Sequence, residues 1–135
     1  MELIMKNIDD IREYFSHDLY AYDTGAYIEE VADRYAKVSL MLTERHKNAV
    51  GGIMGGVYFT IADFAFAVAS NWQEPGTVSL NSDISFIGVP STEKIYAETE
   101  LVKDGRSVCT YIVKVNDGAG KPLAVVKIVG FHKNK

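Results

Sequence analysis

The sequence predicts an α+β fold in which one long helix lies inside a curved antiparallel sheet of five or six strands. Two features carry this prediction. The longest apolar segment, residues 57–72, places apolar side chains at helical spacing. Segments that alternate between apolar and polar residues lie on both sides of it, one region before and four segments after. A chain of 135 residues has the usual length of one domain, so a single domain is expected over residues 1–135.

The first expected element is a short amphipathic helix at about residues 7–16. Its apolar residues recur at helical spacing, acidic residues lie near its beginning, and Asn7 can cap it. Residues 26–48 then combine β-branched and aromatic residues with alternation, which is clearest over residues 35–42. This region is expected to form one or two strands.

The central helix is expected over residues 57–72, with about 16–18 residues and a length of roughly 25 Å. Because the segment is apolar around most of its circumference, it is expected to be buried. Gly55-Gly56 directly precede it, and Pro75-Gly76 follow and end it. The residues at helical spacing are Val57, Ile61, Phe64, Val68 and Trp72.

Strands and turns account for the rest of the chain. Asp104-Gly105 predicts a two-residue hairpin, and residues 117–120 predict a further turn. Because the hairpins are contiguous, the last four strands are expected to form a meander. These strands are expected over residues 77–87, 94–103, 106–116 and 122–132.

Composition and charge exclude several classes of protein. The chain is 47% hydrophobic and 24% charged, as ordinary globular proteins are, which excludes a disordered chain. Its net charge is −4 and its basic residues are scattered, which argues against a nucleic-acid partner. Glycines and polar residues interrupt the apolar residues 48–73, so no membrane span is expected, and no signal peptide is apparent. Cytoplasmic residence is expected.

The cysteine and histidine residues do not indicate a metal site. Cys109 is the only cysteine, which excludes an intramolecular disulfide and a zinc site built from cysteines. It lies in the middle of an expected strand and is interpreted as a small core residue. His17, His46 and His132 are scattered, and no metal-ligand spacing joins them to acidic residues. No metal is therefore expected.

Asp63 is the most informative residue for chemistry. It is the only charged side chain in residues 48–73, and it lies in the middle of the expected central helix. One interpretation is a carboxylate that faces solvent or bonds a neighbouring hydroxyl such as that of Thr60. The other is a general base or nucleophile in an apolar cleft, where burial raises the pKa of a carboxylate.

Three further positions have both a structural and a chemical interpretation. The backbone N–H groups at Gly55-Gly56 lie at the positive end of the helix, where they can polarise a carbonyl group. A glycine pair at this position can also form a simple turn. Asn48 by itself is typical of a turn. Ser79 fits the alternation of its strand.

Most of these residues belong to an ordered motif in the middle of the chain. The motif reads Asn48-x-x-Gly51-x-x-Met54-Gly55-Gly56, followed after four positions by Ile61-Ala62-Asp63. It resembles the signature of the hotdog-fold acyl-CoA thioesterases of the PaaI type. In that family the run is Asn-x-x-Gly-x-x-His-Gly-Gly, before a helix that bears Leu-Ala-Asp or a close variant. The resemblance extends over about residues 27–131.

The resemblance implies the hotdog fold, a homodimer whose sheets pair edge to edge, and assembly into a homotetramer with active sites at subunit interfaces. It implies that Asp63 is the general base or nucleophile and that the Gly55 N–H polarises the thioester carbonyl. Asn48, from the second chain, would position the water or the carbonyl group, and Ser79 would lie near the attacking water. Met54 and Gly56 would contact the substrate. Coenzyme A enters as part of the substrate, and no retained cofactor is implied.

One residue departs from the family motif. Met54 replaces the histidine of His-Gly-Gly, and methionine cannot donate the hydrogen bonds of that histidine. The predicted function is hydrolysis of a short- or medium-chain or aryl acyl-CoA, and the alternative is a hotdog protein that binds an acyl ligand without turnover. A hotdog dehydratase is less consistent, because no histidine follows Asp63 until His132. Five aromatic residues fit either an acyl pocket or the core: Tyr58, Phe59, Phe64, Phe66 and Trp72.

Overall fold

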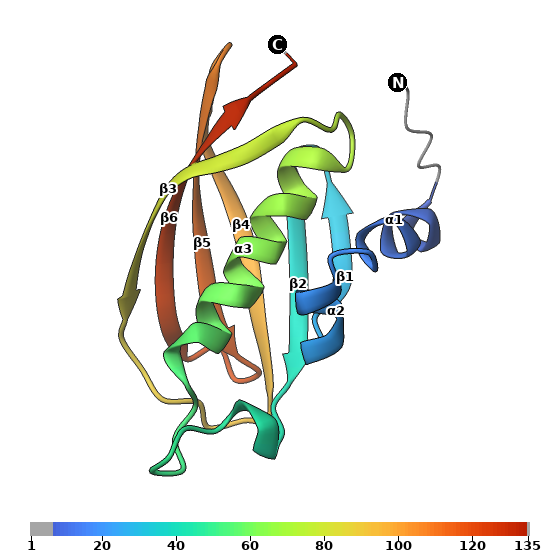
Figure 1. Cartoon of the computed structure of the whole chain (residues 1–135). Coiled ribbons are helices and arrows are strands. Elements are labelled where there is room, and N and C mark those ends of the chain that lie inside the picture. Colours follow the sequence, from blue (N-terminus) through green and yellow to red (C-terminus); the bar gives the residue numbers. More distant parts are fainter. Residues whose placement is uncertain (1–6, 135) are drawn as a thin grey trace.

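The computed structural model describes residues 7–134 and confirms the α+β fold. Figure 1 shows the long helix α3 lying across one face of a curved sheet. The helices are α1 (Ile8–Phe15), α2 (Leu19–Thr24), the short 3₁₀ helix η1 (Glu44–His46) and α3 (Gly55–Asn71). The strands are β1 (Tyr27–Ala32), β2 (Tyr35–Met41), β3 (Thr77–Phe86), β4 (Lys94–Asp104), β5 (Val108–Asp117) and β6 (Pro122–His132).

The strands make one antiparallel sheet in the order β1-β2-β4-β5-β6-β3. The core lies between this sheet and α3, because alternate strand residues are apolar and buried while their neighbours are polar. Fully buried residues include Ile61, Ala65 and Val68 of α3 and Val38, Ala97, Val113 and Val126 of the sheet. Within residues 7–134, no helix is both long enough and apolar enough to cross a membrane.

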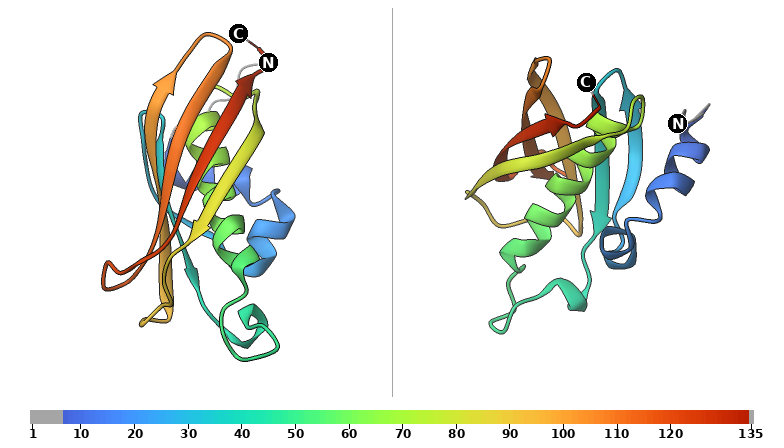
Figure 2. Two further views of the ribbon diagram at one scale, coloured as in Figure 1. Left: turned by 90° about the vertical axis from the view of Figure 1, so that its left-hand side faces the viewer. Right: turned by 45° about the horizontal axis from the view of Figure 1, so that its top comes forward.

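The prediction that the last four strands form a meander is wrong at one connection. Hairpins join β4, β5 and β6 in that order, but β3 pairs with β6 at the edge of the sheet, not with β4 (Figure 2). Residues 87–93 carry the chain from β3 to β4, and β2 occupies the place beside β4. A tight turn specifies which strands are neighbours, whereas this longer connection, which contains Pro90, leaves the choice to tertiary packing.

The helices lie close to their predicted positions. Asn7 caps α1 as expected, since its side chain accepts a hydrogen bond from the backbone N–H of Asp10 at 2.9 Å. α3 begins at Gly55, so the glycine pair forms its first turn instead of preceding it. α2, with 6 residues, is too short to show a helical period, and the sequence does not predict it.

One predicted hairpin turn differs in length. Residues 105–107 separate β4 from β5, so Asp104-Gly105 does not form a two-residue turn. The Gly105 N–H instead donates to the carbonyl oxygen of Val108 at 2.8 Å. The strand positions on both sides of the turn agree with the prediction.

The predicted turn at residues 117–120 is confirmed. One Asp117 carboxylate oxygen accepts the backbone N–H groups of Ala119 and Lys121, each at 2.9 Å. The other oxygen accepts the backbone N–H and the hydroxyl of Ser91 at 2.9 and 2.7 Å. These hydrogen bonds, those of Ser91 most of all, hold the pKa of Asp117 well below its ordinary range.

Candidate active site

Asp63 lies in the middle of α3, on the side that faces α2. It is half-buried and lines a cavity of about 400 Å³ that opens to solvent. α3 contributes Phe59, Thr60, Phe64 and Ala67 to this cavity, besides Asp63 itself. The opposite wall consists of Asp18, Leu19, Tyr20 and Ala21. The cavity is therefore lined by aromatic and aliphatic groups, with one carboxylate from each wall.

The environment of the Asp63 carboxylate is unusual for an acid. Burial raises the pKa of Asp63 above its ordinary value, and the charge of Asp18 raises it further. No group within residues 7–134 forms a hydrogen bond with this carboxylate. The Thr60 hydroxyl does not serve as its partner, because it donates to the carbonyl oxygen of Gly56 at 2.8 Å. Such a carboxylate is suited to take a proton from water or to attack a carbonyl carbon.

Asp18 is a site residue that the sequence analysis missed. It occupies the N-cap position of α2, yet its side chain makes no capping hydrogen bond there. Asp18 is exposed, and partial desolvation of its carboxyl group raises the pKa of Asp18. No sequence signal could have found it, since α2 is too short to be predicted and Asp18 is 45 residues from Asp63 in the chain (63 − 18).

The N-terminus of α3 is packed against an aromatic ring. A Cβ atom at Gly55 would lie 2.8 Å from Cε1 of Phe86, so only glycine allows the ring this close. The Phe86 ring also packs beside Tyr58, with 6.4 Å between ring centroids. Met54, at the N-cap position, is 59% exposed and makes no side-chain capping bond. The first N–H groups of α3 therefore lie beside an apolar wall, at the positive end of the helix.

The loop before α3 is held by Asn48 and His46. The Asn48 side-chain oxygen accepts the backbone N–H groups of Val50 at 3.1 Å and Gly52 at 3.0 Å, which is the turn role that its sequence suggests. The backbone carbonyl of buried His46 accepts the N–H of Met54 at 3.0 Å. These bonds fix the glycine-rich segment and leave Asn48 exposed on the surface.

A single chain does not bring the predicted site residues together. Gly55 and Asp63 are eight positions apart on α3, which separates them by about 12 Å along the helix axis. Ser79 is exposed on β3 opposite Gly130, and neither Ser79 nor Asn48 lines the Asp63 cavity. A reaction centre that combines Asp63 with Gly55 or Asn48 therefore requires these residues from two chains.

The aromatic residues of α3, together with Trp72 at its C-cap, divide between the cavity and the core. Phe59 and Phe64 line the cavity beside Asp63. Phe66 is buried and packs edge-on against Tyr111, with 5.5 Å between ring centroids. Trp72 packs against the core and donates its ring N–H to the carbonyl oxygen of Ala32 at 2.9 Å.

The fold and the site define a hotdog-type protein that carries a carboxylate on its central helix and begins that helix with a glycine pair. Comparison with known proteins then identifies the family. Residues 50–124 match the thioesterase superfamily, and the chain belongs to this family.

The individual relatives agree with this assignment. A protein of Archaeoglobus fulgidus, provisionally named an esterase, is 30% identical over 130 residues, which cover 95% of this chain and 84% of the relative. The structure of an asparagine-to-aspartate mutant of PaaI, a phenylacetic acid degradation protein of Thermus thermophilus, is 26% identical, with a TM-score of 0.78 and coverage of 84% and 97%. A hypothetical thioesterase of Streptococcus pneumoniae, solved with coenzyme A, has a TM-score of 0.80 at 21% identity, with coverage of 88% and 94%.

Proposed function

We propose that this chain is an acyl-CoA thioesterase in which Asp63 acts as general base or nucleophile. The observation that carries the proposal is the Asp63 carboxylate itself: it faces a cavity beside Phe59 and Phe64 and has no hydrogen-bond partner among the described residues. Keeping an acid in such a place raises its pKa and costs free energy, which a purely structural role would not require. Membership of the thioesterase superfamily supports the reaction class.

In this proposal the thioester carbonyl lies at the N-terminus of α3, where the Gly55 N–H and the helix dipole stabilise the developing oxyanion. Asp63 takes a proton from water, which attacks the carbonyl carbon, and coenzyme A leaves as its thiolate. Direct attack by Asp63 would instead form a mixed anhydride that water then cleaves. The acyl group, short- or medium-chain or aryl, occupies the cavity beside Phe59 and Phe64. The S. pneumoniae neighbour with bound coenzyme A supports this substrate class.

The reaction centre in this proposal is shared between two chains of a homodimer. β3 is an edge strand with unpaired backbone groups on its outer side, and its apolar residues Val78, Leu80 and Phe86 are exposed. Antiparallel pairing of two β3 strands would continue the sheet and bury these residues. The two-fold axis would reverse one α3 against the other, bringing the N-terminus of one helix toward the middle of its partner. We expect such dimers to pair into a homotetramer.

One observation favours a second function, binding of an acyl ligand without turnover. Met54 stands where the family motif has histidine, and its exposed side chain forms no capping bond. A site without that histidine holds the carbonyl group less firmly. The binding function predicts that acyl-CoA is bound but no free thiol is released.

Thiol release from a panel of short, medium, long and aryl acyl-CoAs tests the reaction. The Asp63→Asn variant is expected to lose about 100-fold or more of the rate, because it removes the base and keeps the side-chain volume. Asp23→Asn is the matched control, since Asp23 is exposed on α2 and does not line the cavity. Undiminished turnover by a folded Asp63→Asn protein would exclude the proposal.

Co-expression of two inactive variants tests whether the site is shared. In a mixed dimer one chain carries Asp63→Asn and the other carries Asn48→Ala. If each site takes Asp63 from one chain and Asn48 from the other, one of the two sites contains both intact residues and the other contains neither. Random assortment then restores roughly a quarter of the wild-type rate. If both residues serve the same chain's site, the mixture stays inactive, which would contradict the shared centre.

A further inference from the structure

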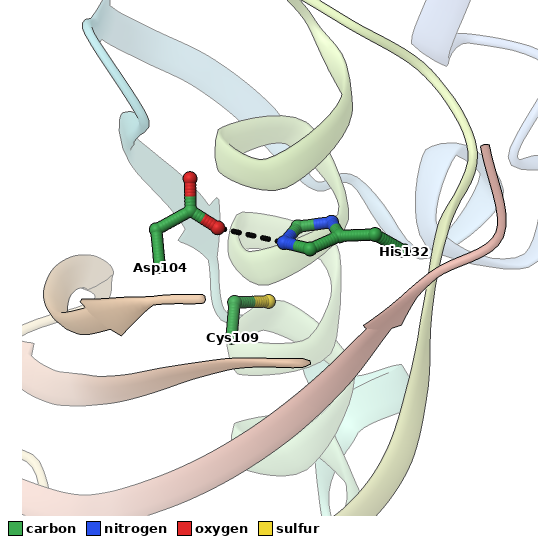
Figure 3. A group of neighbouring side chains, drawn as sticks. All are labelled: Asp104, Cys109 and His132. Atoms are coloured by element: carbon green, nitrogen blue, oxygen red, sulfur yellow. Dashed lines mark hydrogen bonds and ion pairs between the residues drawn. The ribbon is translucent and has the colours of Figure 1, made fainter. Parts of the chain in front are cut away.

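Three side chains with metal-binding atoms converge at the other end of the molecule from Gly55. Asp104 ends β4, Cys109 lies at the beginning of β5, and His132 ends β6. Figure 3 shows the three side chains directed toward one another, with α3 behind them. One carboxylate oxygen, the thiol sulfur and one ring nitrogen all lie within 4.8 Å of one another. Asp104 and Cys109 lie on the two sides of the β4–β5 hairpin turn, and the pairing of β5 with β6 brings the more distant His132 to them.

Further side chains hold the cluster in place. Nε2 of His132 lies 2.6 Å from Oδ1 of Asp104, and Nδ1 of the same ring lies 2.7 Å from the hydroxyl of Thr77. The other carboxylate oxygen of Asp104 forms an ion pair with Arg34 Nε at 2.5 Å. Arg34 is the only residue other than glycine with a positive φ, 51°, within residues 7–134, and its N–H donates to Gln73 at 2.7 Å. The surroundings thus orient both the carboxylate and the ring.

We propose that Asp104, Cys109 and His132 form a binding site for a divalent transition-metal ion of the zinc class. The ligand atoms are Oδ1 of Asp104, Sγ of Cys109 and Nε2 of His132. Cys109 is 1% exposed, whereas His132 also lines a cavity of about 200 Å³ beside the C-terminal end of α3. Asp104 and Cys109 do not line this cavity, so it borders the cluster only at the ring of His132. In the proposed site a water molecule is the fourth ligand. The proposal is independent of the thioesterase reaction.

The donor set fits zinc better than the common hard cations. Zinc takes thiolate, imidazole and carboxylate ligands in tetrahedral sites, and three protein ligands with one water is a typical arrangement. Magnesium and calcium prefer oxygen ligands and would leave Cys109 and His132 unused. The contacts behind the ligands also fit, since a ligating histidine normally bonds a neighbour through its second nitrogen, as His132 does with Thr77.

Small movements would convert the observed cluster into a tetrahedral site. With bonds of about 2.0 Å to nitrogen and oxygen, two such ligands lie about 3.3 Å apart, so Nε2 and Oδ1 must separate by roughly 0.7 Å. In the metal-bound form the neutral ring carries its one proton on Nδ1, which donates to the Thr77 hydroxyl, and Nε2 is left without a proton to bind the ion. The Cys109 thiol releases its proton as the sulfur binds. Arg34 retains its own oxygen of Asp104 throughout.

Cobalt(II) provides a direct test, because its thiolate complexes absorb in the near ultraviolet and Cys109 is the only cysteine in the chain. Tag-free, metal-free protein is titrated with cobalt(II) chloride under reducing conditions. The expected result is a thiolate-to-cobalt absorption band that saturates at one ion per chain and disappears when zinc is added. Absence of this band, or cobalt bound without it, would overturn the proposal.

Three variants locate the ion. Cys109→Ser is expected to abolish the band, and Asp104→Asn, which keeps the thiol and the side-chain volume, to lower cobalt affinity at least about tenfold. His17→Ala is the control, since His17 is exposed on the N-terminal segment, and it should bind as wild type does. Thermal unfolding without metal shows whether each variant is folded, and zinc should raise the melting temperature only of proteins that keep the site. If folded Asp104→Asn bound cobalt with wild-type affinity, the proposed site with Asp104 as a ligand would be overturned.

Discussion

Asp63 on α3 and Asp117 at the end of β5 are both partly or fully buried, and their surroundings shift their pKa values in opposite directions. Asp117 accepts four hydrogen bonds, which lower its pKa and keep it ionised. Asp63 has no hydrogen-bond partner within residues 7–134, and burial raises its pKa. The first acid joins two loops, and the second remains free for chemistry. Hydrogen-bond satisfaction therefore separates an acid that stabilises the fold from the acid that we propose as the catalytic group.

The two shifts have opposite consequences for stability as the pH changes. The folded chain holds Asp117 ionised more readily than the unfolded chain, so its stabilisation is present above the unfolded pKa and is lost as the pH falls through the folded pKa. For Asp63 the folded pKa is the higher one, so ionisation costs stability as the pH rises through the unfolded pKa toward the folded pKa.

The largest expected effect comes from exchanging each acid for its amide. Asp63→Asn should lose about 100-fold or more of the hydrolysis rate, yet melt at or slightly above the wild-type temperature at neutral pH. The melting temperature of Asp117→Asn should be several degrees below that of the wild type, because only one of the two atoms at the end of an amide side chain can accept hydrogen bonds. Its activity per folded chain should be unchanged. Thiol release measures the hydrolysis rate of each variant, and thermal unfolding measures its melting temperature. A reversed pattern, with Asp63→Asn the less stable protein, would break the comparison.

A smaller effect is expected at the start of α3. Gly55→Ala places a methyl group 2.8 Å from the ring of Phe86 and must displace it, so we expect about a tenfold loss of kcat/KM. Gly56→Ala is the comparison within the glycine pair: it adds the same methyl group, but that carbon meets only the flexible end of Met54 at 3.6 Å and does not reach Phe86. Steady-state kinetics of the two variants provide the measurement. Equal kinetics would show that the Phe86–Gly55 contact does not matter to the reaction.

The smallest expected effect concerns Asp18. Its negative charge raises the pKa of Asp63, so Asp18→Asn should move the acidic limb of the kcat/KM profile to lower pH by less than about one unit. Asp18 keeps contact with solvent, which screens the interaction. Asp23→Asn, on the same helix, should leave the profile unchanged. An unmoved limb in Asp18→Asn would show that burial alone sets the pKa of Asp63.

The parts of the fold that depend on local pattern could be predicted. The apolar spacing of residues 57–72 identifies α3, and alternation identifies the strands, because both are set by neighbours a few residues away. The pairing of β3 with β6 could not be predicted, since no tight turn specifies it. α2 was also missed, and with it Asp18, because one and a half helical turns leave no period to detect.

In the candidate site, too, some features could be predicted from the sequence and others depend on the tertiary structure. The sequence by itself determined that Asp63 is the exceptional charge of the central helix, that a glycine pair lies at the start of this helix or directly before it, and that the motif resembles that of thioesterases. Only the tertiary structure decided that Asp63 shares a cavity with Asp18, and that Gly55 lies about 12 Å from Asp63 along one helix. It also brought Asp104, Cys109 and His132 together, although scattered histidines give no metal-ligand spacing. Spacing along a chain reports contacts within one element, whereas contacts between strands depend on register and sheet order, which arise only when the whole core packs.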